Sequence, residues 1–398
     1  MSNNTRCAAA LSTLRIGTSG DYGLCCLMSM NSLTGNDVER FKMQHMSIAD
    51  FWKSPDRIKL LDALDAGIQH RACHICWEIE NAGGVSLRMR ENERLDGVTL
   101  NKHTLPKTID LNLSHTCNIK CRTCSSLSSS SWAAEDKDLP DYGNQNPRIL
   151  AILTDRRRIT DNDLIQIRNI MTDVTVINAY GGEPMLVKEL WVLLEMFSDE
   201  ELKKMTFHMN TNGTIFNEKK LSVLQKFKEV IINVSIDGIG TQFEYLRHPA
   251  KWNEVEENLN KFLLVSAQNQ WQLDVCITVS AFNIYYLPEI IGYFEMRQIS
   301  YYLNVAHDPS LLSLSVFPDN VREQIHNRLA KALNEKIATH PHYVDQVRTI
   351  MSLLQSAKFV KEDLDKFLVN TKAHDDYRNE SCNAVFPELF EMLSRSHT

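Results

Sequence analysis

The chain has 398 residues, of which 43% are hydrophobic and 23% charged, and its formal net charge is −7. This composition is ordinary for a globular protein, and no apolar run approaches the roughly 18 residues that a membrane-spanning helix needs. The first residues, MSNNTRCAAALSTLRIG, lack the hydrophobic core and cleavage site of a signal peptide. We therefore expect a cytoplasmic protein without a membrane partner. The acidic balance also argues against a general nucleic-acid-binding role.

Residues 1–100 contain short segments, one helical stretch over 47–67, and five of the ten cysteines. Three more cysteines follow before residue 125, so eight of the ten lie in the first third of the chain. In a reducing compartment, grouped cysteines are more often metal ligands or catalysts than disulfides. We therefore expect an N-terminal cysteine-rich module over residues 1–100.

Residues 101–316 alternate between short β-branched or aromatic runs and amphipathic stretches. The predicted strands are 108–115, 174–181, 205–212, 230–237, 273–280 and 301–308, and the clearest helices are 161–171, 186–197, 217–228 and 287–298. This repeated alternation predicts an α/β fold, a parallel sheet closed into a partial (β/α)6 TIM-like barrel. In such barrels the chemistry lies at the carboxyl ends of the strands.

Residues 317–398 are mainly helical by pattern and form the expected C-terminal extension. The segment DDYRNESCNAVFPELFEML, 375–393, could cover the open side of the barrel or bind a partner. The apolar residues of VFPELFEML recur at helical spacing, which most often means packing. Cys382 in this segment is expected to be structural.

Three cysteines stand within eight residues after the first predicted barrel strand: Cys117, Cys121 and Cys124. Three thiolates on one loop can bind three irons of a cubane iron–sulfur cluster and leave the fourth iron open to another ligand. A structural zinc site is the alternative, but it needs four ligands, usually in two separated pairs. A chance group of buried cysteines is the remaining alternative.

The spacing Cys-x3-Cys-x2-Cys resembles the signature of the radical S-adenosylmethionine (SAM) superfamily, and the resemblance covers about residues 108–310. It implies a 4Fe–4S cluster whose open iron chelates the amino and carboxylate groups of SAM. It further implies reductive cleavage of SAM to methionine and a 5′-deoxyadenosyl radical, which takes a hydrogen atom from the substrate. An electron donor such as flavodoxin or ferredoxin would be a partner.

Further motifs follow in the order that the resemblance implies. The GGEP turn resembles the motif that receives the SAM ammonium group; its residues are Gly181, Gly182, Glu183 and Pro184. Four residues at strand ends would lie near the ribose hydroxyls and the methionine part of SAM: Asn210, Asn212, Ser235 and Asp237. Arg247 resembles the position that pairs with the SAM carboxylate, which suits a planar guanidinium. Taken singly, each of these residues could equally be a solvated loop residue or a strand-end cap.

The N-terminal cysteines resemble the twitch or SPASM-type auxiliary-cluster module. The pattern is Cys7, then Gly20-x4-Cys25, then Cys73-x2-Cys76, and the intervening text resembles radical SAM proteins in which a twitch domain precedes the barrel. The implied second 4Fe–4S cluster would bind Cys7, Cys25, Cys73 and Cys76, with Cys26 as the alternative to Cys25. A four-cysteine zinc ribbon remains open, because thiolates alone do not choose iron over zinc.

The substrate is weakly specified. A peptide or protein is favoured, with crosslinking, oxidation or epimerisation as the outcome, although no block of a leader-binding domain's size is evident before the cysteine module. A small metabolite such as a sugar is the second alternative, and a non-catalytic metal-binding scaffold or regulator is an alternative of another class. Cys276 shares the polar face of its strand with Thr278 and Ser280, so its thiol could return a hydrogen atom to a substrate radical. It could also be an inert buried cysteine.

Overall fold

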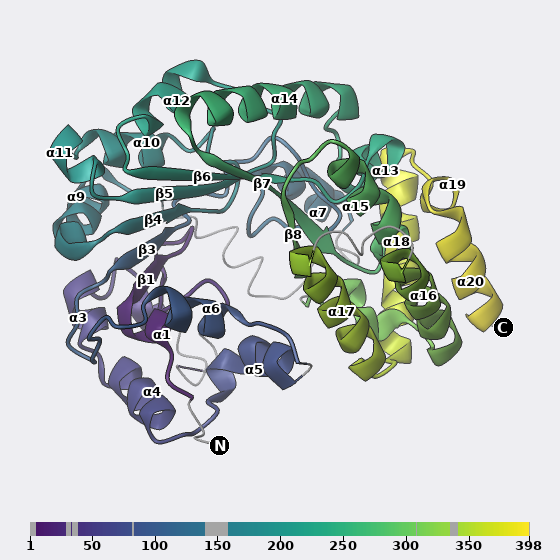
Figure 1. The fold of residues 1–398 in the computed structure, drawn as a ribbon, viewed down its shortest axis with the longest axis horizontal. Coiled ribbons are helices and arrows are strands. Elements are labelled where there is room, and N and C mark those ends of the chain that lie inside the picture. Colours follow the sequence, from purple (N-terminus) through teal and green to yellow (C-terminus); the bar gives the residue numbers. More distant parts are fainter. Residues whose placement is uncertain are drawn as a thin grey trace. The chain divides into compact units, whose positions relative to one another are not determined.

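The protein is described here by a computed structural model (Figure 1). The structure describes residues 5–28, 33, 39–81, 83–139, 158–307, 309–334 and 341–397. The chain divides into two compact units. Unit 1 comprises Met1–Thr116, Thr154–Met209 and Asn217–Ile231, and unit 2 comprises Cys117–Leu153, Asn210–Phe216 and Ile232–Thr398. The domain boundaries at residues 100 and 316 stay a prediction.

Eight strands form one sheet in the order β2-β1-β3-β4-β5-β6-β7-β8. They are β1 (Thr13–Ile16), β2 (Tyr22–Gly23), β3 (Thr108–Leu111), β4 (Val176–Ala179), β5 (Thr206–Thr211), β6 (Glu229–Ser235), β7 (Gln272–Val279) and β8 (Tyr301–Val305). The pairs β1–β3, β3–β4, β4–β5 and β7–β8 are parallel, whereas β1 and β2 are antiparallel. The predicted α/β class is confirmed, and the mostly parallel sheet is consistent with a partial barrel.

Each of the six predicted barrel strands overlaps one observed strand, β3 to β8. Strands β1 and β2 were not predicted. They have four and two residues, which is too short for an alternation of apolar and polar residues to be recognised. Strand β2 pairs with β1, and β1 pairs with β3, so the N-terminal segment contributes strands to the sheet as well as cysteines.

Unit 1 surrounds its strands with short helices (Figure 1). These are α1 (Ala8–Ser12), η1 (Glu39–Phe41), α3 (Ile48–Trp52), α4 (Pro55–Asp65), η2 (Arg71–Cys73), α5 (His74–Asn81), α6 (Leu87–Arg94), α9 (Asp161–Ile170), η4 (Met171–Asp173), α10 (Lys188–Glu195), α11 (Asp199–Leu202) and α12 (Glu218–Leu224). Helix α4 begins where Ser54 caps the amide of Arg57. The buried Arg57 guanidinium then donates to the carbonyls of Trp52, Lys102 and Leu11, which ties three segments together.

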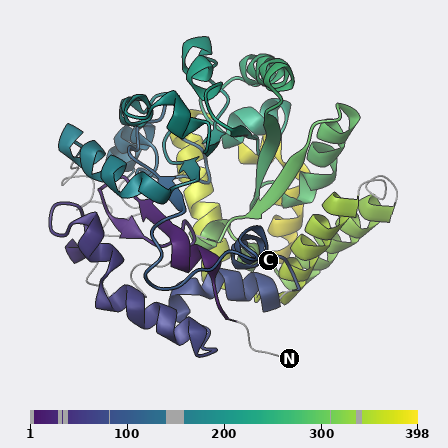
Figure 2. The same ribbon diagram turned by 60° about the vertical axis from the view of Figure 1, so that its left-hand side comes forward.

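Unit 2 is richer in long helices. They are η3 (Ser130–Trp132), α7 (Ala133–Asp138), α13 (Gly240–Leu246), α14 (Trp252–Asn269), η5 (Ile284–Tyr286), α15 (Leu287–Met296), η6 (Ser310–Leu312), η7 (Leu314–Val316), α16 (Asp319–Ala332), α17 (Pro341–Ser356), α18 (Lys361–Arg378), α19 (Cys382–Val385) and α20 (Pro387–His397). Helices α16 and α17 run side by side in both views (Figures 1 and 2).

The C-terminal extension is helical, as predicted. Leu389 and Leu393 of α20 are fully buried, so the apolar stripe is a packing face. Phe386, between α19 and α20, packs against the ring of Tyr286 at 5.4 Å. Among the helices that the structure describes, none combines the length and the hydrophobicity of a membrane crossing.

Candidate functional site

The loop that carries Cys117, Cys121 and Cys124 belongs to unit 2 and is held by hydrogen bonds at its middle and at its first cysteine. The amides of Lys120 and Arg122 donate to carbonyls at the end of α13, those of His248 and Leu246, at 2.7 and 2.8 Å. The carbonyl of Cys117 accepts a hydrogen bond from the Ser131 hydroxyl at 2.8 Å. The loop therefore has a defined conformation that displays three thiols from eight residues.

Two predicted SAM-site residues contact the sulfur atoms of this loop. The Nδ2 amide of Asn212 lies 3.7 Å from Sγ of Cys117. The Nη1 of Arg247 lies 3.9 Å from Sγ of Cys121. Asn212 and Arg247 thus lie beside the thiols of Cys117 and Cys121, although each is more than 90 positions away from its cysteine in the sequence.

Asp237 orients Arg247. One carboxylate oxygen of the buried Asp237 lies 2.8 Å from Nη2 of Arg247, and the other accepts the amide of Thr278 at 2.7 Å. Its two oxygens are therefore committed to protein partners. Asp237 therefore holds the guanidinium of Arg247 beside Cys121, and its predicted place near the ribose hydroxyls or the methionine part of SAM stays a prediction.

The surroundings of the thiols disfavour free thiolates. Burial is the main cause that raises the pKa of Cys121 to about 11; the charge of Arg247 opposes this rise and that of Asp237 adds to it. Burial and the negative charge of Cys121 raise the pKa of Cys124 as well. Thiolates at these positions therefore need a cationic metal centre to balance them. Three soft sulfur donors on one loop fit an iron–sulfur cluster.

The GGEP turn belongs to unit 1 and lies against residues 112–116. Gly181 and Gly182 have φ angles of 74° and 50°. A Cβ on Gly182 would lie 2.4 Å from the carbonyl oxygen of Thr116, so only glycine permits this approach. The amide of Glu183 donates to the same oxygen at 2.8 Å.

The other two residues of the turn also have contacts within unit 1. The buried carboxylate of Glu183 accepts the amide of Met185 at 3.0 Å. The carbonyl of Pro184 accepts a hydrogen bond from the indole of Trp191 at 2.9 Å. These contacts close the turn.

A second group of polar side chains follows the strands of unit 2. Asn210 accepts a hydrogen bond from Asn233 of β6 at 3.2 Å, and Asn233 also donates to the hydroxyl of Tyr302 on β8 at 2.9 Å. Asn233 and Tyr302 were not predicted as site residues. Each carries a polar group within a predicted strand, but a single polar residue in a strand is too common to indicate a site. Ser235, at the end of β6, is half-buried.

Cys276 is buried on β7 and adjoins this group. The Nδ2 of Asn304 lies 3.3 Å from its sulfur, and the hydroxyl of Tyr302 also bonds to it. Burial raises the pKa of Cys276 to about 11, so its sulfur is a protonated thiol at neutral pH. A protonated thiol is the form that can donate a hydrogen atom.

The N-terminal cysteines of unit 1 share one cavity. Its lining includes all four predicted ligands, Cys7, Cys25, Cys73 and Cys76, and its empty volume is about 430 Å³, part of it open to solvent. Cys26 is exposed and is not part of this lining. Among the residues that the structure describes, no three His, Cys, Asp or Glu side chains converge as ligands of a single metal ion.

Unit 1 also contains a polar row that the sequence analysis did not identify. Arg15, Asp110, Asn178 and His208 are register partners across β1, β3, β4 and β5. Asn178 donates to Asp110 at 2.7 Å, and its carbonyl lies 3.1 Å from the His208 ring. Burial is the main cause that raises the pKa of Asp110 to about 6. Register across four strands cannot be read from the sequence, which explains why the row was missed.

The model of the Radical SAM superfamily matches residues 111–266. This range begins at the last residue of β3 and includes the three-cysteine loop, the GGEP turn and Arg247. The chain contains a radical SAM domain. The resemblance inferred from Cys117, Cys121 and Cys124 is thereby confirmed at the level of the superfamily, while the N-terminal twitch module stays a prediction.

Several solved structures resemble parts of the chain, and no curated protein matches it. Native anSMEcpe with bound AdoMet and Cp18Cys peptide is 16% identical over 58% of this chain, with a TM-score of 0.40. Streptococcus suis SuiB bound to S-adenosylmethionine is 12% identical over 81% of this chain and 68% of its own, with a TM-score of 0.36. TYW1 with a lysine–pyruvate adduct is 14% identical over 57% of this chain and 72% of its own, with a TM-score of 0.31. The chain covers 60% of the anSMEcpe structure.

Proposed function

We propose that this protein is a radical SAM enzyme, in which Cys117, Cys121 and Cys124 bind a 4Fe–4S cluster and leave one iron for SAM. The observation that carries the proposal is the placement of Arg247 and Asn212 against the sulfurs of Cys121 and Cys117, inside a segment that matches the superfamily. A structural thiol site has no need of a buried arginine braced beside one of its sulfurs.

When bound, the reduced cluster supplies the electron that cleaves SAM and so yields the radical that abstracts hydrogen from the substrate. The residues of this chain bind and orient the cofactor. Arg247, held by Asp237, receives the SAM carboxylate through its planar fork. Asn210, Asn212 and Ser235 offer hydrogen bonds to hydroxyl groups, and the backbone of the GGEP turn receives the ammonium group.

For the N-terminal cysteines we propose a second 4Fe–4S cluster bound by Cys7, Cys25, Cys73 and Cys76. Their common cavity supports this ligand set, and the exposure of Cys26 favours Cys25 over it. Zinc requires four ligands that converge at about 2.3 Å on one ion. Each cysteine of a cubane instead binds its own iron. A zinc ribbon on the same four cysteines is the alternative, and metal analysis of the anaerobically purified protein distinguishes the two.

A peptide or protein is the proposed substrate, and a flavodoxin or ferredoxin the proposed electron donor. The substrate proposal rests on the twitch-like cysteine pattern, which is typical of radical SAM enzymes that modify peptides. Cys276 would return a hydrogen atom to the substrate radical if the reaction is an epimerisation. A small metabolite as substrate is the second candidate.

The test is SAM cleavage by anaerobically reconstituted protein reduced with dithionite. We expect 5′-deoxyadenosine even without substrate, and about eight iron atoms per chain, four for each cluster. The triple variant C117A/C121A/C124A should keep about four iron atoms and form no 5′-deoxyadenosine. A wild-type protein that holds only zinc, or holds iron but leaves SAM intact, would support a scaffold and overturn the proposal.

A further inference from the structure

We propose that Asp375 and Glu380 of the C-terminal extension are positioning residues of the three-cysteine loop, and that the charged group around them sets the reduction potential of the cluster. This inference rests on the proposed function, since it assumes a cluster on that loop. The residues concerned lie outside the segment that matches the superfamily, so they are a feature of this chain's own extension.

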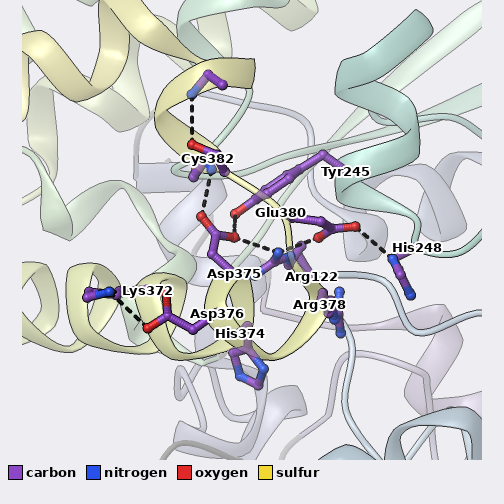
Figure 3. A network of polar contacts seen from close by, with 12 residues as sticks. Arg122, Tyr245, His248, Lys372, His374, Asp375, Asp376, Arg378, Glu380 and Cys382 are labelled. Carbon is purple, nitrogen blue, oxygen red and sulfur yellow. Dashed lines mark hydrogen bonds and ion pairs between the residues drawn. The ribbon is translucent and has the colours of Figure 1, made fainter.

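Arg122 links the loop to the extension. It stands between Cys121 and Cys124, and its Nη2 lies 2.7 Å from Oδ1 of Asp375 and 2.6 Å from Oε2 of Glu380. Figure 3 shows both carboxylates directed at this guanidinium, from the end of α18 and from the segment before α19. Both carboxylates lie more than 250 positions from Arg122 in the sequence.

Each carboxylate is fixed by further partners. Asp375 accepts hydrogen bonds from the hydroxyl of Tyr245 at 2.7 Å and from the amide of Cys382 at 2.6 Å. Glu380 lies 2.7 Å from Nδ1 of His248, whose carbonyl accepts the Lys120 amide of the loop. Burial opposes ionisation of Glu380, but its contacts with His248 and Arg122 outweigh this and lower its pKa. Both carboxylates are therefore held rigidly, and Glu380 is charged at neutral pH.

A second ion group joins the same loop to α18. The fully buried Glu135 of α7 lies 2.7 Å from Nζ of Lys120 and 2.9 Å from Nε of Arg378, and His374 bonds to it at 2.6 Å. Lys120 and Arg122, the two cationic residues between the cysteines, therefore both form ion pairs. Lys120 pairs with Glu135 of α7, and Arg122 pairs with Asp375 and Glu380. Three cations, Lys120, Arg122 and Arg378, balance three anions, Glu135, Asp375 and Glu380.

The arginines need no further anion. The guanidinium of Arg122 stacks over the ring of Tyr245 at 4.1 Å, and that of Arg378 stacks over Trp132 at 4.7 Å. Aromatic faces therefore cover the guanidinium nitrogens that lack a hydrogen-bond partner. The group is complete as it stands, which favours a structural and electrostatic role over a ligand site.

The charges are close enough to act on the cluster ligands. Arg122 and Cys124 line one pocket, which Trp132 and His374 also border. Arg122 also directly follows Cys121 in the chain. Charge interactions are strong where water is excluded. Reduction adds one negative charge to the cluster, so an uncompensated cation nearby favours the reduced state and an uncompensated anion opposes it.

The redox experiment compares three single variants of the reconstituted enzyme. Glu380→Gln removes an anion and keeps the shape, Lys120→Met removes a cation, and Asp376→Asn is the matched control. Asp376 is on the same helix, but it pairs with Lys372 on the exposed face, both side chains being about 70% exposed (Figure 3). The measurement is the midpoint potential of the SAM-binding cluster in a redox titration followed by electron paramagnetic resonance.

We expect E380Q to shift the potential to more positive values, K120M to more negative values, and D376N not to shift it. A merely structural role would not give shifts of opposite sign. For the positioning role, hydrogen exchange of residues 117–124 is measured in cluster-free protein, where we expect E380Q and Arg122→Lys to exchange faster than D376N. Shifts of equal sign, or exchange equal to that of D376N, would overturn the inference. If wild-type protein has no SAM-responsive cluster, the proposed function itself has failed.

Discussion

The guanidinium of Arg247 lies 3.9 Å from the sulfur of Cys121. We predict that Arg247→Lys weakens SAM binding to the reconstituted protein about tenfold, equivalent to about 1.4 kcal/mol, because an ammonium cannot replace the planar fork. Lysine is chosen over alanine because an unpaired, buried Asp237 would destabilise the fold by about 3–5 kcal/mol. Isothermal titration calorimetry with SAM is the measurement.

The control for this prediction is Arg297→Lys. Arg297 pairs with Glu256 and is about one-third exposed, so its conservative replacement should leave SAM affinity unchanged. Equal affinity of R247K and R297K would remove Arg247 from the cofactor site.

The GGEP turn gives a prediction about backbone approach. A Cβ at Gly182 would meet the Thr116 carbonyl at 2.4 Å, whereas at Gly240, which has a similar φ of 55°, it would meet no atom within 4 Å. Both alanine variants bear the cost of a left-handed residue, about 1–2 kcal/mol. We expect Gly182→Ala to lower the melting temperature clearly more than Gly240→Ala in thermal scans of the reconstituted protein. Equal losses would show that the close approach to Thr116 contributes nothing.

Asp110 gives a pH-dependent prediction. Burial raises its pKa from 3.8 to about 6, so the folded state binds its proton more tightly than the unfolded state does. The corresponding stability is present below about pH 4 and is lost as the pH rises through 6, at a cost of up to about 3 kcal/mol. Asp110→Asn should therefore exceed the wild type in melting temperature by a larger margin at pH 8 than at pH 5.5.

The control for Asp110 is the half-exposed Asp173, which pairs with Lys107. The difference in melting temperature between Asp173→Asn and the wild type should not increase with pH. A constant difference between D110N and wild type across this range would mean that Asp110 stays ionised in the fold.

Cys276 distinguishes between reaction outcomes. If its thiol returns a hydrogen atom, Cys276→Ala should still consume SAM and abstract hydrogen, but net product should fall at least about tenfold, since the substrate radical loses its donor. Product analysis in deuterated buffer, with the peptide substrate, measures this, because the exchangeable thiol would deliver deuterium. Full turnover by C276A, with no deuterium in the wild-type product, would show that Cys276 is an inert buried cysteine and not the hydrogen-atom donor.

The strands that position the site were predictable because each has a local pattern. The run TIDLNLSH and its five counterparts are short, apolar and bounded by polar residues, and each overlaps an observed strand. The three-cysteine loop was predictable for a similar reason, because its chemistry depends on spacing within eight residues. Neither inference required knowledge of how distant segments meet.

What the sequence did not predict depends on long-range contacts. In the sequence, Arg122 is indistinguishable from an ordinary basic loop residue. Only the structure shows that it donates a hydrogen bond to Asp375, 253 positions away. Asp237 was predicted as a SAM-site residue from its strand-end position, but its ion pair with Arg247 was found only in the structure. Ion pairs between distant residues do not recur at a fixed spacing, so the pattern of hydrophobic residues cannot predict them.

The central claim is that the cluster on Cys117, Cys121 and Cys124 binds SAM through an open iron. Low-temperature electron paramagnetic resonance of the dithionite-reduced protein, recorded with and without SAM, tests it most directly. The account predicts that SAM changes the spectrum of one cluster, and that this response is absent from C117A/C121A/C124A but kept in a variant with Cys73 and Cys76 replaced by alanine. A reduced wild-type spectrum identical with and without SAM would contradict it.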